Sequence, residues 1–271
     1  MGSHQTLLLK GHLTTRQLVA AALLSGAVFA SPWVIADESN SNGTSWGLGL
    51  GVMSQQKPYA GIDRDNTPVP LLLVENRYLR VFGPEVEFKL PRLDISASQQ
   101  LHFGVVAQYD GSGYEQGDAA ILNGMSERKG GFWAGATVEW SSDIVNVSAK
   151  WLTDVSDNSD GHRINVGLER TWQFGEHVLL TPRLGATWQD EESVDYYFGV
   201  RNSEARFDRP AYAGESAINI EAGMRGVYRF NQHHSVLMGV EVTSLADEIK
   251  DSPLVDRSTE NSVFLGYLYH F

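Results

Sequence analysis

The feature that most constrains this chain is an alternation with period 2 that runs through a series of segments of about ten residues. In the segment 217–230, every second residue from Ile218 to Phe230 is apolar or glycine, whereas the residues between them include Glu221 and Arg225. Successive side chains of a β-strand point to opposite faces, so each such segment predicts a strand with one oily and one polar face. Strands of this kind build either a soluble sandwich or a transmembrane barrel.

Three further features favour the barrel. A length of about ten residues is what a tilted membrane strand requires. Aromatic side chains such as Trp46 and Tyr228 stand at the ends of the oily faces, where a membrane interface would place them. Very short connections alternate with long ones at 110–130, 190–216 and 246–261, which is typical of outer-membrane barrels. We therefore predict an all-β fold, a transmembrane antiparallel up-and-down β-barrel.

The composition agrees with a barrel although it resembles that of a soluble protein. The 271 residues are 42% hydrophobic and 20% charged, and the mean hydropathy is -0.23. A low average is expected when only every second strand residue faces lipid. The chain has no cysteine, which excludes a thiol nucleophile, a zinc-thiolate site and an iron-sulfur cluster. Its formal net charge of -12 makes nucleic acid an unfavourable partner.

The N-terminus resembles an export signal. Residues 1–36 contain Lys10 and Arg16 but no acidic residue, and an apolar run follows that is too short to span a bilayer as a helix. We predict a signal peptide at 1–36, cleaved after Ala36 or, as the alternative, after Ala30, and a barrel over 37–271. Cleavage after Ala36 removes two basic residues and changes the net charge from -12 to -14. An amphipathic helix of a cytoplasmic protein is the alternative to export.

The number of strands follows from parity, because both termini of such barrels lie on the periplasmic side, where the turns are short. We expect twelve strands, or ten if 78–90 forms one bulged strand. The twelve expected strands are 45–53, 69–75, 78–83, 85–97, 101–110, 131–141, 144–153, 162–173, 177–189, 217–230, 234–245 and 262–271. Tyr267, Tyr269 and Phe271 alternate to the terminal residue and resemble the signal by which bacterial barrel assembly machinery recognises its substrates; an ordinary last strand is the alternative.

The polar faces of these strands carry charges of both signs. The predicted lumen-lining residues are Glu139, Lys150, Glu169, Arg183, Glu221, Arg225, Arg229 and Glu241. Mixed signs on neighbouring strands favour cross-strand pairs in a confined space. A barrel of ten or twelve strands is largely filled by such side chains, so a narrow pore or a plugged barrel fits better than a wide porin.

No constellation of residues predicts catalysis. His162 lies near Ser156, Ser159 and Asp160 and is the sole candidate for hydrolytic chemistry, but a polar loop is the simpler interpretation. We assign no catalytic, cofactor-binding or metal-binding residue, and we expect no cofactor.

Two acidic regions contain carboxylates that could bind metal ions. The stretch 154–161 departs from the spacing of a calcium loop, and we expect a tight turn in which Asp and Ser side chains bond their own backbone. A second set of acidic residues makes the outer loops acidic: Asp190, Glu191, Glu192, Asp195, Asp247, Glu248, Asp251 and Asp256. A solvated rim is the default; divalent cations that bridge lipopolysaccharide are the alternative.

Several local motifs resemble a known family. They are Asp-Tyr-Tyr-Phe-Gly-Val at 195–200, Arg-Pro-Ala-Tyr at 209–212, the segment 246–255 and the turn 154–161. Together they are similar to the MltA-interacting protein (MipA) / OmpV family of Gram-negative outer-membrane proteins, with the resemblance strongest over 150–271. It implies an outer-membrane barrel whose namesake is a scaffold that links a murein transglycosylase to a peptidoglycan synthase. Other members are associated with adhesion, osmotic response or antibiotic susceptibility, and no catalytic residue is carried over.

The leading hypothesis is therefore a non-enzymatic scaffold in the outer membrane of a Gram-negative bacterium, in contact with lipid and lipopolysaccharide. Two alternatives stay open: a narrow porin for small solutes, and an adhesin that acts through the long acidic loops.

Overall fold

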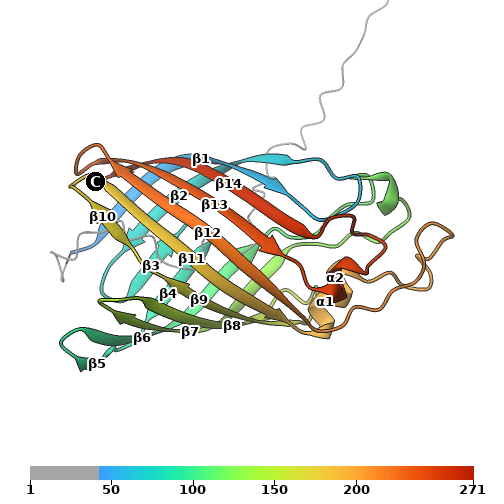
Figure 1. Cartoon of the computed structure of the whole chain (residues 1–271), viewed down its shortest axis with the longest axis horizontal. Helices are drawn as coiled ribbons and strands as arrows, with labels where there is room; N and C mark the ends of the chain where they lie inside the picture. Colours follow the sequence, from blue (N-terminus) through green and yellow to red (C-terminus); the bar gives the residue numbers. More distant parts are fainter. Residues whose placement is uncertain (1–42) are drawn as a thin grey trace, which may run out of the picture.

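The structure is a computed structural model that describes residues 43–271. The predicted signal peptide and both cleavage positions lie outside the described residues. Within them, the strands close into one antiparallel barrel (Figure 1), because β1 pairs with β14 and β9 pairs with β11. The short turns and the C-terminus lie at one end of the barrel, and the long loops with the helices lie at the other. No helix among the described residues is both long enough and apolar enough to cross a membrane.

The strands are β1 (Ser45–Gln56), β2 (Asp65–Glu75), β3 (Leu79–Phe82), β4 (Glu85–Lys89), β5 (Leu93–Ser96), β6 (Gln99–Asp110), β7 (Gly131–Ser142), β8 (Asn146–Asp154), β9 (His162–Glu169), β10 (Trp172–Phe174), β11 (Val178–Gln189), β12 (Ala217–Arg229), β13 (His234–Ser244) and β14 (Thr259–His270). The helices are a 3-10 turn η1 (Ala120–Leu122), α1 (Glu191–Phe198) and α2 (Asp247–Lys250).

The barrel wall has twelve strands. β4 and β5 both pair with β6 across a shift of one residue, and β9 and β10 both pair with β11, so each pair is one interrupted strand. The prediction of twelve is confirmed. The ten-strand alternative is wrong, because the chain reverses between β3 and β4 at Gly83, whose φ of 56° favours glycine.

The oily faces of the strands point outward, as the alternation predicts. Leu50 is 62% exposed, and Leu48 and Val52 beside it are also exposed. The inward faces near the short turns carry a buried inner apolar cluster. Its members are Met53, Val69, Leu71, Leu73, Phe82, Leu179, Val227, Leu237, Phe264 and Leu268. The barrel is therefore oily outside, and part of its interior is packed with apolar side chains.

The barrel wall has few strand-pairing contacts where β2 meets β3. β2 pairs with β1 over its whole length but with β3 only at residues 73–75. The Leu72 carbonyl accepts from the Gly83 N–H at 3.1 Å, so even-numbered residues of β2 turn their backbone polar groups toward β3. Pro68 and Pro70 occupy two of these positions above the end of β3. Proline has no backbone N–H. At these two positions of β2 an N–H group would have no partner strand, so proline leaves no donor unsatisfied there.

The long loops contain helices that the sequence analysis did not predict. Asp190 accepts the Ser193 N–H at 3.0 Å and caps the N-terminus of α1. Val194, Tyr197 and Phe198 then form its buried face. A helix of two turns is too short to show a sustained helical period in the sequence. The local indication of a helix was the N-cap residue Asp190 followed by Glu191 and Glu192.

Candidate functional site

Six of the eight charged residues predicted to line the lumen are buried and ion-paired. Their side chains form the inner ion pairs: Lys150–Glu85 at 2.6 Å, Arg225–Glu169 at 2.5 Å, Arg183–Glu221 at 3.8 Å and a short Arg183–Glu241 contact. β8 does not adjoin β4, nor β12 β9, nor β11 β13. Three of these pairs therefore bridge one or two intervening strands on the inside of the barrel.

The other two predicted residues stand outside these pairs. Glu139 accepts a hydrogen bond from Ser141 Oγ at 3.1 Å on its own strand. Arg229 is half-buried at the end of β12, and its backbone N–H donates to the His177 carbonyl at 2.7 Å.

Sequence reasoning missed the charged residues of β3 and β4. Arg80 bridges Glu75 at 3.1 Å and Glu87 at 3.0 Å, and Lys89 contacts Glu75 at 2.5 Å. The alternation of charged and apolar residues along 80–89 could have indicated them. In this region, however, the sequence left open whether the chain forms one strand or two. Glu85, the partner of Lys150, belongs to the same stretch.

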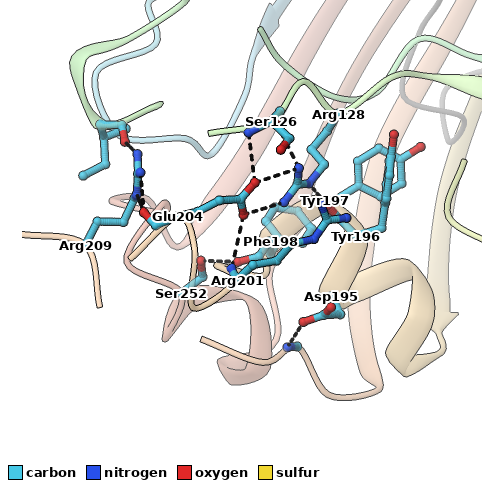
Figure 2. Close-up of polar contacts among 12 residues, drawn as sticks. Ser126, Arg128, Asp195, Tyr196, Tyr197, Phe198, Arg201, Glu204, Arg209 and Ser252 are labelled. Atoms are coloured by element: carbon cyan, nitrogen blue, oxygen red, sulfur yellow. Dashed lines mark hydrogen bonds and ion pairs between the residues drawn. The ribbon is translucent and has the colours of Figure 1, made fainter. Parts of the chain in front are cut away.

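The long loops fold into a loop cap, formed by residues 57–64, 111–130, 155–161, 190–216 and 246–258. A buried pair ties two of these segments together, because Arg128 contacts Glu204 at 2.9 Å with side chains only 2% and 4% exposed (Figure 2). Glu204 also accepts the N–H groups of Ser126 and Arg201 at 2.9 and 3.1 Å. Burial alone would raise the pKa of Glu204, but these hydrogen bonds outweigh it and lower the pKa to about 2.

The motifs that resemble the MipA / OmpV family lie in this cap. Arg209 is 1% exposed and donates to the carbonyls of Glu204, Ile121 and Asn123. Ser252 Oγ donates to the Phe198 carbonyl at 2.6 Å (Figure 2). These arginine and serine side chains satisfy loop carbonyls that have no strand partner.

An apolar cluster fills the cap beneath these polar contacts. Its buried members include Tyr59, Tyr114, Trp133, Tyr197 and Leu254. Tyr59 Oη donates to the Tyr197 carbonyl at 3.2 Å, and burial raises the pKa of Tyr114 to about 12. The loops thus have a core of their own, which holds them over the mouth of the barrel.

The acidic stretch 154–161 forms the tight turn that the sequence predicted. Asp154 accepts the N–H groups of Ser156, Asn158 and Ser159 at 2.8, 3.2 and 2.6 Å. Both serine hydroxyls also donate to Asp154, at 2.5 and 2.8 Å. This network of side chain and backbone holds the turn closed.

The histidine candidate has no catalytic geometry among the described residues. The ring of His162 stacks on Trp151 with centroids 5.8 Å apart, while the hydroxyls of Ser156 and Ser159 point to Asp154. In residues 43–271, no three His, Asp or Glu side chains converge as metal ligands. Asp190 and Asp195, which we placed in a solvated acidic rim, instead bind backbone N–H groups of Ser193 and Gly214.

A polar cavity of about 120 Å³ lies between the inner ion pairs and the loop cap. Glu221 and Glu241 line it from the strands, and Tyr59, Tyr197 and Phe198 line it from the cap. Asp110 and Arg163 form a short ion pair on its wall, and the Arg163 guanidinium lies 3.9 Å from the ring centroid of Trp133.

The aromatic residues at the C-terminus form part of the outer surface. Tyr267 and Phe271 are exposed, and Phe271 stacks on Trp46 of β1 with centroids 4.3 Å apart. Tyr269 packs edge-on against Phe271 at 5.0 Å. β14 therefore ends in an outward aromatic patch beside the first strand.

Comparison with known proteins decides the family. The family model described as MltA-interacting protein MipA matches residues 48–271. The chain belongs to the MipA family. A putative outer-membrane protein of Escherichia coli, YiaT, is 25% identical over 90% of this chain and 97% of its own length. The E. coli MltA-interacting protein is 26% identical over 83% and 89%. OmpV of Vibrio cholerae is 26% identical over 63% and 66%.

Solved outer-membrane barrels are also similar to this MipA-family chain. The NanC porin is 9% identical, covers 82% of this chain and 98% of its own, and has a TM-score of 0.44. The predicted family and the predicted location in the outer membrane of a Gram-negative bacterium are confirmed. With this location, the short-turn end of the barrel faces the periplasm and the loop cap faces outward.

Proposed function

We propose that this MipA-family protein is a non-enzymatic scaffold that holds peptidoglycan-remodelling enzymes at the periplasmic end of its barrel. The observation that carries the proposal is the occupied interior: the buried pairs Lys150–Glu85, Arg225–Glu169 and Arg183–Glu241 bridge non-adjacent strands on its inner face. The loop cap lies over its outer end. A barrel filled in this way acts through its surfaces rather than through its lumen. The name of the E. coli relative, MltA-interacting protein, points to a murein transglycosylase as one partner.

A scaffold needs a surface, and turns of two or three residues offer little of the roughly 800 Å² that a stable interface takes from each partner. β5 offers more. All four of its residues are exposed, and among the described strands it pairs only with β6. Leu93 and Ile95 are 57% and 56% exposed on one face of it. An extended segment of an enzyme can add a strand to such an edge, and we place the enzyme-binding surface there.

Capture of purified enzymes tests this function. The protein in nanodiscs is expected to retain a lytic murein transglycosylase and a peptidoglycan synthase. The double variant Leu93→Ser/Ile95→Ser is expected to lose about tenfold in affinity, or roughly 1.4 kcal/mol. Ile144→Ser, in the neighbouring β7–β8 turn and 71% exposed, is the matched control and should bind as the unchanged protein does. Failure of the unchanged protein to retain either enzyme would contradict the scaffold.

The polar cavity supports a second candidate, a narrow channel for small solutes lined by the eight predicted charges. Planar-bilayer recording separates the two functions. A scaffold with a filled interior gives no single-channel steps, whereas a channel gives steps that change with substitutions at Glu221 or Glu241, which line the cavity.

Two contacts with the envelope belong to the same proposal. The outward aromatic patch of Tyr267, Tyr269 and Phe271 serves as the signal for the barrel assembly machinery, and the oily outer faces contact lipid and lipopolysaccharide. Replacing Phe271 by Ser is expected to reduce the amount of folded protein in the outer membrane, measured by heat-modifiable migration, while Trp172→Ser, another exposed aromatic residue, is expected to change it less.

A further inference from the structure

The polar cavity contains hydrogen-bonding groups that the described protein does not satisfy. Gln108 and Gln189 line it from β6 and β11, and they are only 7% and 9% exposed. Neither side-chain amide has a hydrogen bond to another described residue, although most buried amides have one. Each amide brings two donors and one acceptor. Two such groups that line one cavity from different strands indicate a site that receives a polar solute.

The charges around the cavity indicate the sign of that solute. Four carboxylates and two cationic side chains line it: Asp110, Glu221, Glu241, Glu260, Lys57 and Arg163. Arg163 forms an ion pair with Asp110, and Arg183 beneath the cavity forms ion pairs with both Glu221 and Glu241. One arginine thus faces two carboxylates, which leaves an excess of negative charge.

Glu260 is the carboxylate that the protein leaves open to a ligand. No hydrogen bond or ion pair joins its side chain to another residue in 43–271. Lys57 lies on the same cavity and attracts the Glu260 carboxylate electrostatically, but its ammonium group donates its hydrogen bond to the Gly113 carbonyl at 3.0 Å. The aromatic rings of Tyr59, Tyr197 and Phe198 line the cap side of the same space, and aromatic faces attract cations.

We propose that this cavity binds a small organic cation, an ammonium or guanidinium solute, with Glu260 as its charge partner and Gln108 and Gln189 as its hydrogen-bond partners. This site is independent of the enzyme-binding surface at β5, which lies at the opposite end of the barrel. Lys57 and Gly113 belong to loops, so the loop cap forms part of the cavity lining.

Methylguanidinium and its neutral isostere N-methylurea are the probes. Ligand-observed NMR titration of the full protein in detergent is expected to show methylguanidinium binding at least tenfold tighter than N-methylurea, with acetate weaker than both. Glu260→Gln is expected to weaken methylguanidinium binding at least tenfold. Glu191→Gln, an exposed acid of α1 outside the cavity, is the matched control and should leave it unchanged.

A variant that is expected to strengthen binding distinguishes a loss of the ligand site from a folding defect. Lys57→Met removes a positive charge from the cavity and is expected to tighten methylguanidinium binding several-fold, an effect that partial misfolding does not produce. The proposal is overturned if no probe binds, which leaves a cavity for water alone, or if the urea binds as well as the cation. Tighter binding of acetate, or equal binding to Glu260→Gln, overturns it as well.

Discussion

At the scale of single residues, the buried carboxylate of Glu204 makes the loop cap sensitive to acid. Burial would raise its pKa, but the Ser126 N–H, the Arg128 guanidinium and the Arg201 N–H together lower it from 4.5 to about 2. A group whose pKa is lower in the folded state stabilises that state above its unfolded pKa. This contribution, on the order of 3 kcal/mol, is therefore present above about pH 4.5 and is lost as the pH falls toward about 2.

Hydrogen exchange in the cap measures this effect. After correction for intrinsic rates, amides in 201–209 are expected to exchange faster as the pH falls from about 5 to about 2.5. Glu204→Gln breaks the buried pair, at a cost of about 3 kcal/mol, so its cap should open at neutral pH and respond less to acid. Glu215→Gln, an exposed acid of the same loop, should behave as the unchanged protein. A cap that is indifferent to pH in the unchanged protein contradicts this account.

At the scale of elements, the β3–β4 hairpin is a weakly paired part of the wall. Its ladder to β2 has three residue pairs, whereas β11 and β12 pair at twelve positions. Lys150 of β8 contacts Glu85 at the start of β4 at 2.6 Å, over the two strands between them. This ion pair substitutes in part for the missing strand contacts.

Replacing Glu85 by Gln should therefore loosen the hairpin selectively. We expect amide exchange in 79–89 to become about tenfold faster, equivalent to roughly 1.4 kcal/mol, while β12 and β13 stay unchanged. Asp94→Asn, an exposed acid of β5, is the control. Faster exchange throughout the barrel, or none in the hairpin, would show that the ion pair does not have this local role.

The same elements show what the sequence could predict. Strands such as 177–189 and 217–230 were found because a membrane strand must alternate along its whole length, and this pattern is local. α1 was missed because its two turns depend on the cap into which Tyr197 and Phe198 pack. The Lys150–Glu85 pair and the cavity were missed because they join residues from strands that are not neighbours. Such contacts depend on barrel closure and strand tilt, which no local pattern encodes.

At the scale of the whole molecule, we expect the stability of the protein to be independent of metal ions, although its outer end is acidic. Three acidic groups at this end bind the chain itself: Asp154 at the end of β8 closes a turn, Asp190 caps a helix and Asp195 binds Gly214. Addition of a chelator should leave the unfolding temperature of the purified protein within about 1 °C, since a loss of 1 kcal/mol would move it by a few degrees. A larger decrease that calcium or magnesium restores would indicate a cation site.

The inside of the barrel makes a second prediction for the whole molecule, because three sets of packed side chains follow one another along it. The loop cap depends on Arg128–Glu204, the inner ion pairs lie beneath it, and the inner apolar cluster with Leu237 and Leu268 lies toward the periplasm. Glu204→Gln loosens only the first. Planar bilayers containing this variant at neutral pH are therefore expected to show no single-channel steps, like the unchanged protein. Steps that appear on loosening the cap alone would mean that the cap is the gate of a channel, and would favour the channel over the scaffold.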